Sequence, residues 1–349
     1  MTGLWYAIVS FTLLMFVVLE GFDFGAGMLL YVVGRNEAER RVVIAAIGPL
    51  WSWNEVWLVS FGGTLLLAFP VIMAASFSGF YMAMFLLVWA MLLRGVSLEL
   101  SGHIPDPLWR TAWYLCFVAS NVLLAALVGA ALGNVLRGAP LGPDGKFCLP
   151  LFTNFSPTGH VGILDWYTLS IALFILATFA AHGAAGLAQR TAGTVRFRCM
   201  NLAASLSKLV LAALAIVTFE TWRIRPDVFS GLTHQPLGWL GLVFVLVGIS
   251  EMFAGLRHGH ESQAKRGSST FIAGIMVAGA AGVFPVILRS TIAPQYSLSV
   301  YGSAADNHGL AIAIVWWPIA CLLSIGYCLF IFRYYRGKTR PADDGQRPY

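Results

Sequence analysis

The sequence predicts an all-α polytopic membrane protein with nine transmembrane helices, arranged as two four-helix bundles plus one extra helix. Two observations predict this class: 58% of the 349 residues are hydrophobic while only 11% are charged, and the hydrophobic residues gather in long runs. This composition leaves too little polar surface for a soluble globule of this length. The first run lacks a basic leading segment and a small-residue cleavage site, so we expect a spanning helix there, not a secretion signal.

Nine runs are long enough to cross a bilayer, which takes about 20 apolar residues in a helix. We expect spans at residues 4–33, 53–75, 77–98, 110–136, 165–190, 199–221, 237–257, 269–290 and 310–334. The segments between them are short apart from residues 137–164 and 222–236, which are rich in turn residues. The expected organisation is therefore one transmembrane domain over residues 1–335 and a polar cytoplasmic tail over residues 336–349.

The distribution of basic residues predicts the orientation. If the N-terminus is outside, most Lys and Arg residues fall in cytoplasmic segments, such as Arg35, Arg40 and Arg41 after the first span. The positive-inside rule therefore favours an outside N-terminus and a cytoplasmic C-terminus. The net charge of +6 follows from this bias, so nucleic acid is not an expected partner.

Cysteine and histidine spacing argues against a metal or haem site in this chain. The five cysteines show neither CxxC nor CxxCH spacing, so we expect no zinc site, no covalent haem attachment and no disulfide framework. Of the seven histidines only His182 lies within a predicted span. A haem held by two histidines needs a second ligand, and hydrogen bonding or packing is the favoured role of His182.

Ionisable residues of the spans gather at one depth, near the cytoplasmic side. Glu20 and Asp23 lie three residues apart near the end of the first span, and therefore on one helix face. A charge at the bilayer centre costs about 2.5 to 3.5 kcal/mol on insertion scales, so each is a functional candidate. The neighbouring spans add Ser52, Glu55, Arg94, Glu99 and His182. Together these residues have the acids and hydrogen-bonding groups that a proton path from the cytoplasm requires.

Structural interpretations of the same residues remain open. Acids at helix ends can lie among lipid headgroups, and Trp51, Trp53 and Trp57 can form an aromatic belt. Arg94 and Glu99 can form a structural ion pair, as can Lys208 and Glu251.

Three glycines follow or separate the first acids. Gly21, Gly25 and Gly27 have the small-residue spacing that lets a second helix approach closely. We expect tight helix packing there, which also helps to keep the acids out of lipid.

Several motifs, taken in order, resemble subunit II of the cytochrome bd-type quinol oxidases, including their cyanide-insensitive relatives. GFDFGAGML at 21–29 is similar to the family's GFD-x-G-x-G-x-L signature. IGPLWSWNEVWLVSFGG at 47–63, with the aromatic positions Trp51 and Trp57, is similar to its second signature. Further matches are FSGFY at 77–81, LLRGVSLE at 92–99, HGAAGLAQRTAGTVRFR at 182–198 and VFPVILRST at 283–291. The likeness covers nearly the whole chain.

The resemblance implies the non-haem subunit of a respiratory quinol oxidase in a prokaryotic plasma membrane. In that family subunit I binds haem b and haem d, oxidises quinol and reduces oxygen to water, while subunit II stabilises subunit I. Some members of subunit II contribute to a proton route or hold a structural quinone, and lipid or small accessory subunits can join. This chain alone is expected not to be catalytic, and we expect it to bind no haem.

The second signature departs from the family at one position. The family commonly has an acid directly after the first tryptophan, and this chain has Ser52. A serine hydroxyl can relay a proton but cannot store charge at neutral pH. Glu55, one turn further along, is our candidate replacement.

Two functions from other classes remain as alternatives. A proton-coupled transporter can use Glu20, Asp23, His182, Lys208 and Glu251 for substrate coupling. A purely structural scaffold needs these polar residues only to lock helices together.

Overall fold

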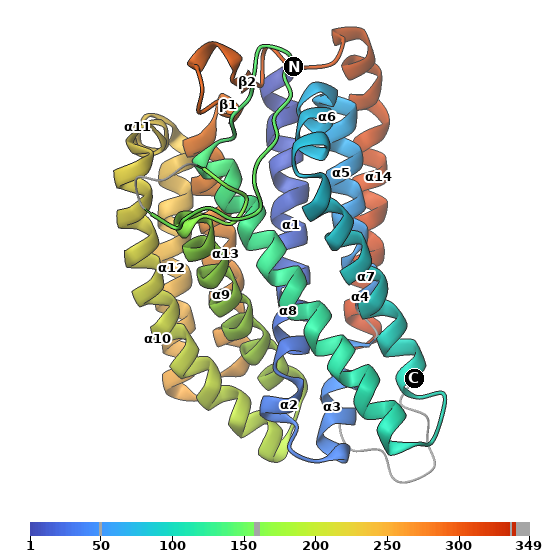
Figure 1. Cartoon of the computed structure of the whole chain (residues 1–349). Helices are drawn as coiled ribbons and strands as arrows, with labels where there is room; N and C mark the ends of the chain where they lie inside the picture. Colours follow the sequence, from blue (N-terminus) through green and yellow to red (C-terminus); the bar gives the residue numbers. More distant parts are fainter. Residues whose placement is uncertain (49–50, 157–160, 336, 340–349) are drawn as a thin grey trace.

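The structure is a computed structural model that describes residues 1–48, 51–156, 161–335 and 337–339. Long helices run side by side along most of the molecule (Figure 1). One end of this bundle carries Met1, and the other carries the short helix α3 (Glu37–Ile47). We call these the Met1 end and the α3 end.

The first half of the chain contains α1 (Thr2–Met28), α2 (Leu30–Val33), α3, α4 (Trp51–Asn54), α5 (Val56–Ala68), α6 (Pro70–Gly79), α7 (Tyr81–Ser101) and α8 (Pro107–Arg137). The second half contains α9 (Trp166–Arg190), α10 (Gly193–Ile224), α11 (Pro226–His234), α12 (Pro236–His258), α13 (Glu261–Val283) and α14 (Asn307–Tyr334). A short antiparallel pair, β1 (Val286–Leu288) and β2 (Leu298–Ser299), lies between α13 and α14 at the Met1 end (Figure 1).

Eight helical stretches of the described residues are long and apolar enough to cross a membrane. The chain is thus an all-α polytopic membrane protein, as predicted. The count of nine spans is not confirmed, because α13 is not among the eight; its first turns carry Glu261, Lys265 and Arg266. The predicted cytoplasmic tail falls mostly on residues outside the described part, which includes only 337–339 of it.

Two predicted span boundaries are wrong. The span expected at 53–75 is divided, because α5 ends at Ala68 and α6 begins at Pro70, whose ring suits the first turn of a new helix. The span expected at 269–290 begins earlier and ends at Val283, and residues 286–288 form strand β1 instead. A long apolar run does not by itself distinguish a helix from a helix followed by a strand.

Contacts between helices agree with two bundles of four plus one further helix. In the first group α1 packs on α5 and α8, and α7 packs on α8. In the second, α9 packs on α10 and α13, and α12 packs on α13. The groups meet where α9 contacts α1 and α8, and α14 lies at the edge. In the most apolar windows of these helices 78% of α9 is buried but only 6% of α14, so α9 is central.

The Met1 end is closed by loops that hydrogen bonds and ion pairs hold in place. Ala139 pairs with Ser290 across two distant loops. Asp227 at the start of α11 accepts from Arg225 at 2.8 Å and from Arg289 at 2.7 Å. The hydrogen bonds from Arg225 lower the pKa of Asp227 to about 2, so the carboxylate stays ionised at neutral pH.

Candidate functional site

The centre of the site is a buried ion pair between α1 and α7. Nη1 of Arg94 lies 2.5 Å from Oε2 of Glu20, and Nη2 lies 3.4 Å from Oε1. The Arg94 and Glu20 side chains are 1% and 0% exposed. The guanidinium also lies 5.0 Å from the centroid of the Phe24 ring. Two parallel hydrogen bonds help to offset the cost of taking both charges out of water.

Glu55 is the third charged member and the one closest to solvent. Its Oε1 lies 3.5 Å from Nη2 of Arg94, and its side chain is 27% exposed. That oxygen forms no hydrogen bond with a described residue. Arg94 therefore joins two carboxylates, one sealed in the interior and one reachable from outside the cluster.

Asp23 lies on the same face of α1, one turn after Glu20. Its Oδ2 accepts a hydrogen bond of 2.7 Å from Nδ2 of Asn54, and both side chains are 1% exposed. Oδ1 of Asp23 and Oδ1 of Asn54 have no hydrogen-bond partner among the described residues. Two carboxylates thus pair with the Arg94 guanidinium and Asp23 acts on it electrostatically, while Asp23 keeps one acceptor for a proton or a water molecule.

His182 on α9 belongs to a second polar group beside the acids. Its Nδ1 lies 2.5 Å from Oγ of Ser268, and its Nε2 lies 2.6 Å from Nζ of Lys265. The imidazole is 0% exposed. The charge of Lys265 also acts on Asp23. This group is therefore coupled to the acids electrostatically, although it forms no ion pair with them.

Glycines let α9 approach α1 closely beside the acids. A Cβ atom at Gly25 would lie 1.8 Å from the carbonyl oxygen of Phe179, and one at Gly183 would lie 2.3 Å from the amide nitrogen of Ala26. At Gly21 the nearest atom is the Phe179 ring at 2.7 Å, and at Gly27 it is the Asn121 side chain at 2.4 Å. Backbones this close leave no room for lipid between the two helices.

Replacing Gly25 with alanine should strongly destabilise the protein. The new methyl group would overlap a backbone oxygen, which cannot move aside as a side chain can, and overpacking a core typically costs about 1 to 3 kcal/mol. Gly279→Ala is the matched control, because nothing lies within 4 Å of a Cβ atom there and alanine favours a helix over glycine. The measurement is the melting temperature of the purified membrane complex. Equal melting temperatures for the two variants would contradict the close approach.

Two of the predicted site residues lie outside this cluster. Ser52 on α4 and Glu99 on α7 are exposed, and no hydrogen bond or ion pair joins either side chain to a described residue. The Trp51 ring lies 5.9 Å from the guanidinium carbon of Arg94. Trp57, only 2% exposed, packs edge to face on Phe11 with the ring centroids 6.0 Å apart.

The ion pairs considered from sequence do not form among the described residues. Arg94 points to Glu20 and Glu55 and not to Glu99, because the two glutamates lie across the helix interface while Glu99 faces outward. Lys208 and Glu251 show no ion pair either, although both lie on membrane-spanning helices.

Sequence reasoning missed three residues of the site. Asn54 lies within the second signature, and nothing in the sequence identifies it as the partner of Asp23. Lys265 lies between the predicted spans at 237–257 and 269–290, yet α13 begins at Glu261 and places it next to His182. Ser268 lies three residues after Lys265, and this helical spacing on one face was the signal available for both.

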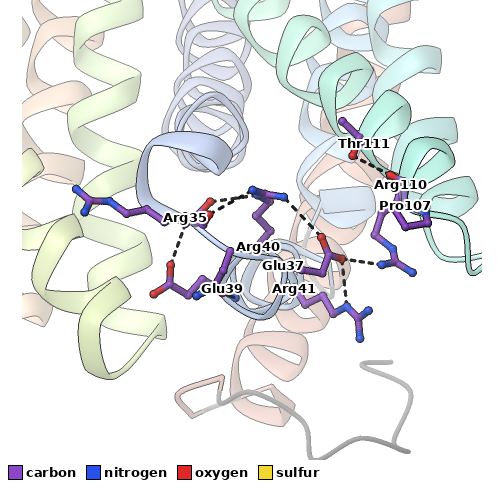
Figure 2. Close-up of polar contacts among 10 residues, drawn as sticks. Arg35, Glu37, Glu39, Arg40, Arg41, Pro107, Arg110 and Thr111 are labelled. Atoms are coloured by element: carbon purple, nitrogen blue, oxygen red, sulfur yellow. Dashed lines mark hydrogen bonds and ion pairs between the residues drawn. The ribbon is translucent and has the colours of Figure 1, made fainter.

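Ion pairs join the helices at the α3 end, as Figure 2 shows. Glu37 lies 3.3 Å from Arg41 on its own helix and 3.1 Å from Arg110 on α8. Glu39 accepts from the backbone of Arg35 at 2.8 Å and pairs with Arg198 of α10 at 2.7 Å. These contacts connect α3 to α8 of the first group and to α10 of the second.

His182, which lies within a membrane-spanning helix, is not free to bind a haem iron. Both ring nitrogens of His182 already contact protein atoms. No group of three or more His, Cys, Asp or Glu side chains in the described ranges is placed to hold a metal ion.

The fold and the site define a class of protein: a polytopic membrane protein with carboxylates, a guanidinium and an imidazole sealed between its helices. The family model described as cytochrome bd terminal oxidase subunit II matches residues 1–335. The chain belongs to this family.

Similar proteins come from several bacteria. A probable cytochrome oxidase subunit 2 of Haemophilus influenzae is 27% identical, over 94% of this chain and 92% of the relative. Cytochrome bd-I ubiquinol oxidase subunit 2 of Escherichia coli is 28% identical, over 92% and 90%. The cytochrome bd ubiquinol oxidase subunit 2 of Bacillus subtilis is 27% identical, over 88% of each chain.

A solved structure shares the fold. The bd oxidase structure from Geobacillus thermodenitrificans contains a chain that superposes with a TM-score of 0.73 at 16% identity, covering 96% of this chain and 98% of that one. The architecture is therefore that of a bd oxidase subunit. The family model, the named relatives and the solved structure all point to a bd-type oxidase subunit and none to a proton-coupled transporter.

Proposed function

We propose that this chain is the non-haem subunit of a quinol:oxygen oxidoreductase in a prokaryotic plasma membrane, with its N-terminus outside and its C-terminus in the cytoplasm. It stabilises a haem-bearing subunit I and lines a proton path that leads from the cytoplasm toward the oxygen-reducing site. The relatives named as ubiquinol oxidase subunits support quinol as the electron donor. Quinol and oxygen are then substrates of the complex, with lipid, a structural quinone or small accessory subunits as further components.

The observation that carries the proton path is the surplus of buried carboxylates. Glu20 and Glu55 pair with Arg94, and Asp23, one turn from Glu20, acts on the same guanidinium electrostatically. Full ionisation of all three carboxylates beside one arginine is therefore unfavourable in the interior. Such a cluster can take up a proton and give it away again. A purely structural ion pair needs only one carboxylate for each guanidinium.

The solvent exposure and hydrogen bonds of Glu55, Glu20 and Asp23 suggest a different role for each carboxylate. Glu55, partly exposed, takes up protons from the cytoplasmic side. Glu20 is held by two hydrogen bonds from Arg94 and keeps the guanidinium in place. Asp23, with one oxygen unpaired among the described residues, holds the proton that moves on. Haem b and haem d, bound by subunit I, would supply the electron transfer to oxygen, and the residues of this chain contribute proton transfer alone.

Two variants test the path at its entrance. We expect Glu55→Gln to slow quinol oxidase turnover, because the amide cannot carry a proton as a carboxylic acid does, with the haem spectrum unchanged. Ser52→Ala is the matched control on the same helical turn, and we expect a much smaller effect because Ser52 is exposed and away from the cluster. The measurement is oxygen consumption per haem. If both variants consume oxygen at nearly the wild-type rate, Glu55 does not have the proposed entrance role.

A further inference from the structure

A cavity of about 530 Å³ opens between α1, α9, α13 and α14 toward the α3 end. Its size lies within the range of small-molecule sites. One wall is apolar and includes Leu19, Phe22 and Phe332. The same lining also carries three cationic side chains, Arg190, Lys265 and Lys338. The proton path described above uses none of these three.

Arg190 and Lys265 lie close together around one aromatic ring. Nζ of Lys265 lies 4.7 Å from the centroid of Phe22, and the guanidinium carbon of Arg190 lies 6.0 Å from the same centroid. The guanidinium is also 6.0 Å from the Phe332 ring, so it lies between two aromatic side chains. These rings hold the guanidinium at a defined place in the cavity wall.

Neither of these two cations has an ion-pair partner among the described residues. Neighbouring basic residues do: Arg196 and Lys338 pair with Glu261 at 2.5 and 2.6 Å. Asp23 acts on the charge of Lys265 from behind the wall, but its oxygen bonds to Asn54 and not to a cation. Asp23 also acts on the charge of Arg190. No carboxylate of the described residues forms an ion pair with Arg190 or Lys265, so both side chains keep hydrogen-bond donors for a bound anion.

We propose that this cavity binds a phosphate group, with Arg190 and Lys265 as its main ligands. A guanidinium presents paired donors that match phosphate oxygens. A lysine ammonium has three N–H donors. One N–H of Lys265 is directed to Nε2 of His182, which leaves the other two for a phosphate oxygen. Lys338 enters from the segment after α14, where Thr339 donates to the carbonyl oxygen of Arg190 at 2.8 Å. Lys338 lines the cavity as well, and its charge is paired with Glu261 at 2.6 Å.

The phosphate can come from an anionic phospholipid or from the cytoplasm as a free ion. The apolar wall next to the cations suits an acyl chain. Basic pockets between membrane helices on the cytoplasmic side bind anionic lipid headgroups. Both sources share one chemistry, so one experiment with two probes separates them.

The test uses the complex purified through this chain and stripped of lipid in detergent. Native mass spectrometry measures binding of dioleoylphosphatidylglycerol, of the net-neutral dioleoylphosphatidylcholine and of inorganic phosphate. We expect phosphatidylglycerol to bind at least about tenfold more tightly than phosphatidylcholine, because the choline ammonium next to the phosphate of phosphatidylcholine is repelled by Arg190 and Lys265. Arg190→Gln should abolish the difference. Arg266→Gln, an exposed neighbour of Lys265 outside the cavity, should retain it.

Each result decides the proposal. If inorganic phosphate binds in an Arg190-dependent way and phosphatidylglycerol shows no preference, the site stands and its ligand is free phosphate. If the Arg190→Gln complex fails to assemble, Lys338→Gln replaces it as the test variant, because Lys338 lies outside the helices. We expect Lys338→Gln to weaken binding of the phosphate-bearing probe about threefold. Binding of neither probe above the phosphatidylcholine level, or equal losses in the Arg190 and Arg266 variants, would overturn the phosphate site.

Discussion

Replacing Arg94 with glutamine is expected to leave little intact haem-bearing complex. The change strands the Glu20 carboxylate in an interior site that is 0% exposed, and removing one partner of a buried ion pair costs about 3 to 5 kcal/mol. Because α1 and α7 meet through this pair, the loss should weaken the contact between them. The measurement is the ratio of haem to protein in the complex purified through this chain, together with its melting temperature.

The double variant Glu20→Gln with Arg94→Gln is the control for this prediction. It removes both charges at once, so no buried charge remains uncompensated, and part of the stability should return. Arg94→Lys keeps a charge but loses the paired donors, and an intermediate result is expected. Wild-type haem content and melting temperature in Arg94→Gln would show that the ion pair is dispensable.

Asp23→Asn is expected to lower turnover while the complex assembles normally. Asparagine has the same shape, and its side-chain oxygen can still accept the hydrogen bond from Asn54. It cannot carry a proton as a carboxylic acid does, and removing a proton-transfer group commonly slows a reaction by about 10²-fold or more. We therefore expect at least a tenfold loss of oxygen consumption per haem, with the haem spectrum unchanged.

Asp165→Asn is the matched control. Asp165 is also a buried carboxylate, 1% exposed and 2.6 Å from Arg137, but it lies at the Met1 end. This variant should lower stability and leave turnover per haem unchanged. If Asp165→Asn and Asp23→Asn reduce turnover equally, the effect reflects a general loss of buried charge. That result would contradict a proton-transfer role of Asp23.

Much of the fold follows from the hydrophobic pattern, and the exceptions have physical causes. Runs of about 20 apolar residues predict spanning helices because a helix is the only single segment that satisfies its own backbone in lipid. The pattern fails where a run contains two elements, as at Pro70 and after Val283. It fails again at α13, because the charged residues in the first turns of this helix look like a loop in the hydrophobic pattern.

The site was only partly predictable for a different reason. The acids stand out because charge is rare in apolar runs, and helical spacing places Glu20 and Asp23 on one face. Their partners come from distant helices, and sequence spacing does not show that Arg94 faces Glu20 and not Glu99. Asn54 is likewise recognisable only from the packing of α4 on α1.

Proton uptake in a single turnover tests the central claim most directly. The fully reduced complex is mixed with oxygen, and a pH-sensitive dye follows uptake of protons from the cytoplasmic side. A proton path through Asp23 predicts that Asp23→Asn slows this uptake while Ser52→Ala does not, with oxygen binding at wild-type speed in both. Uptake at the wild-type rate in Asp23→Asn would contradict the path and leave this chain with a structural role alone.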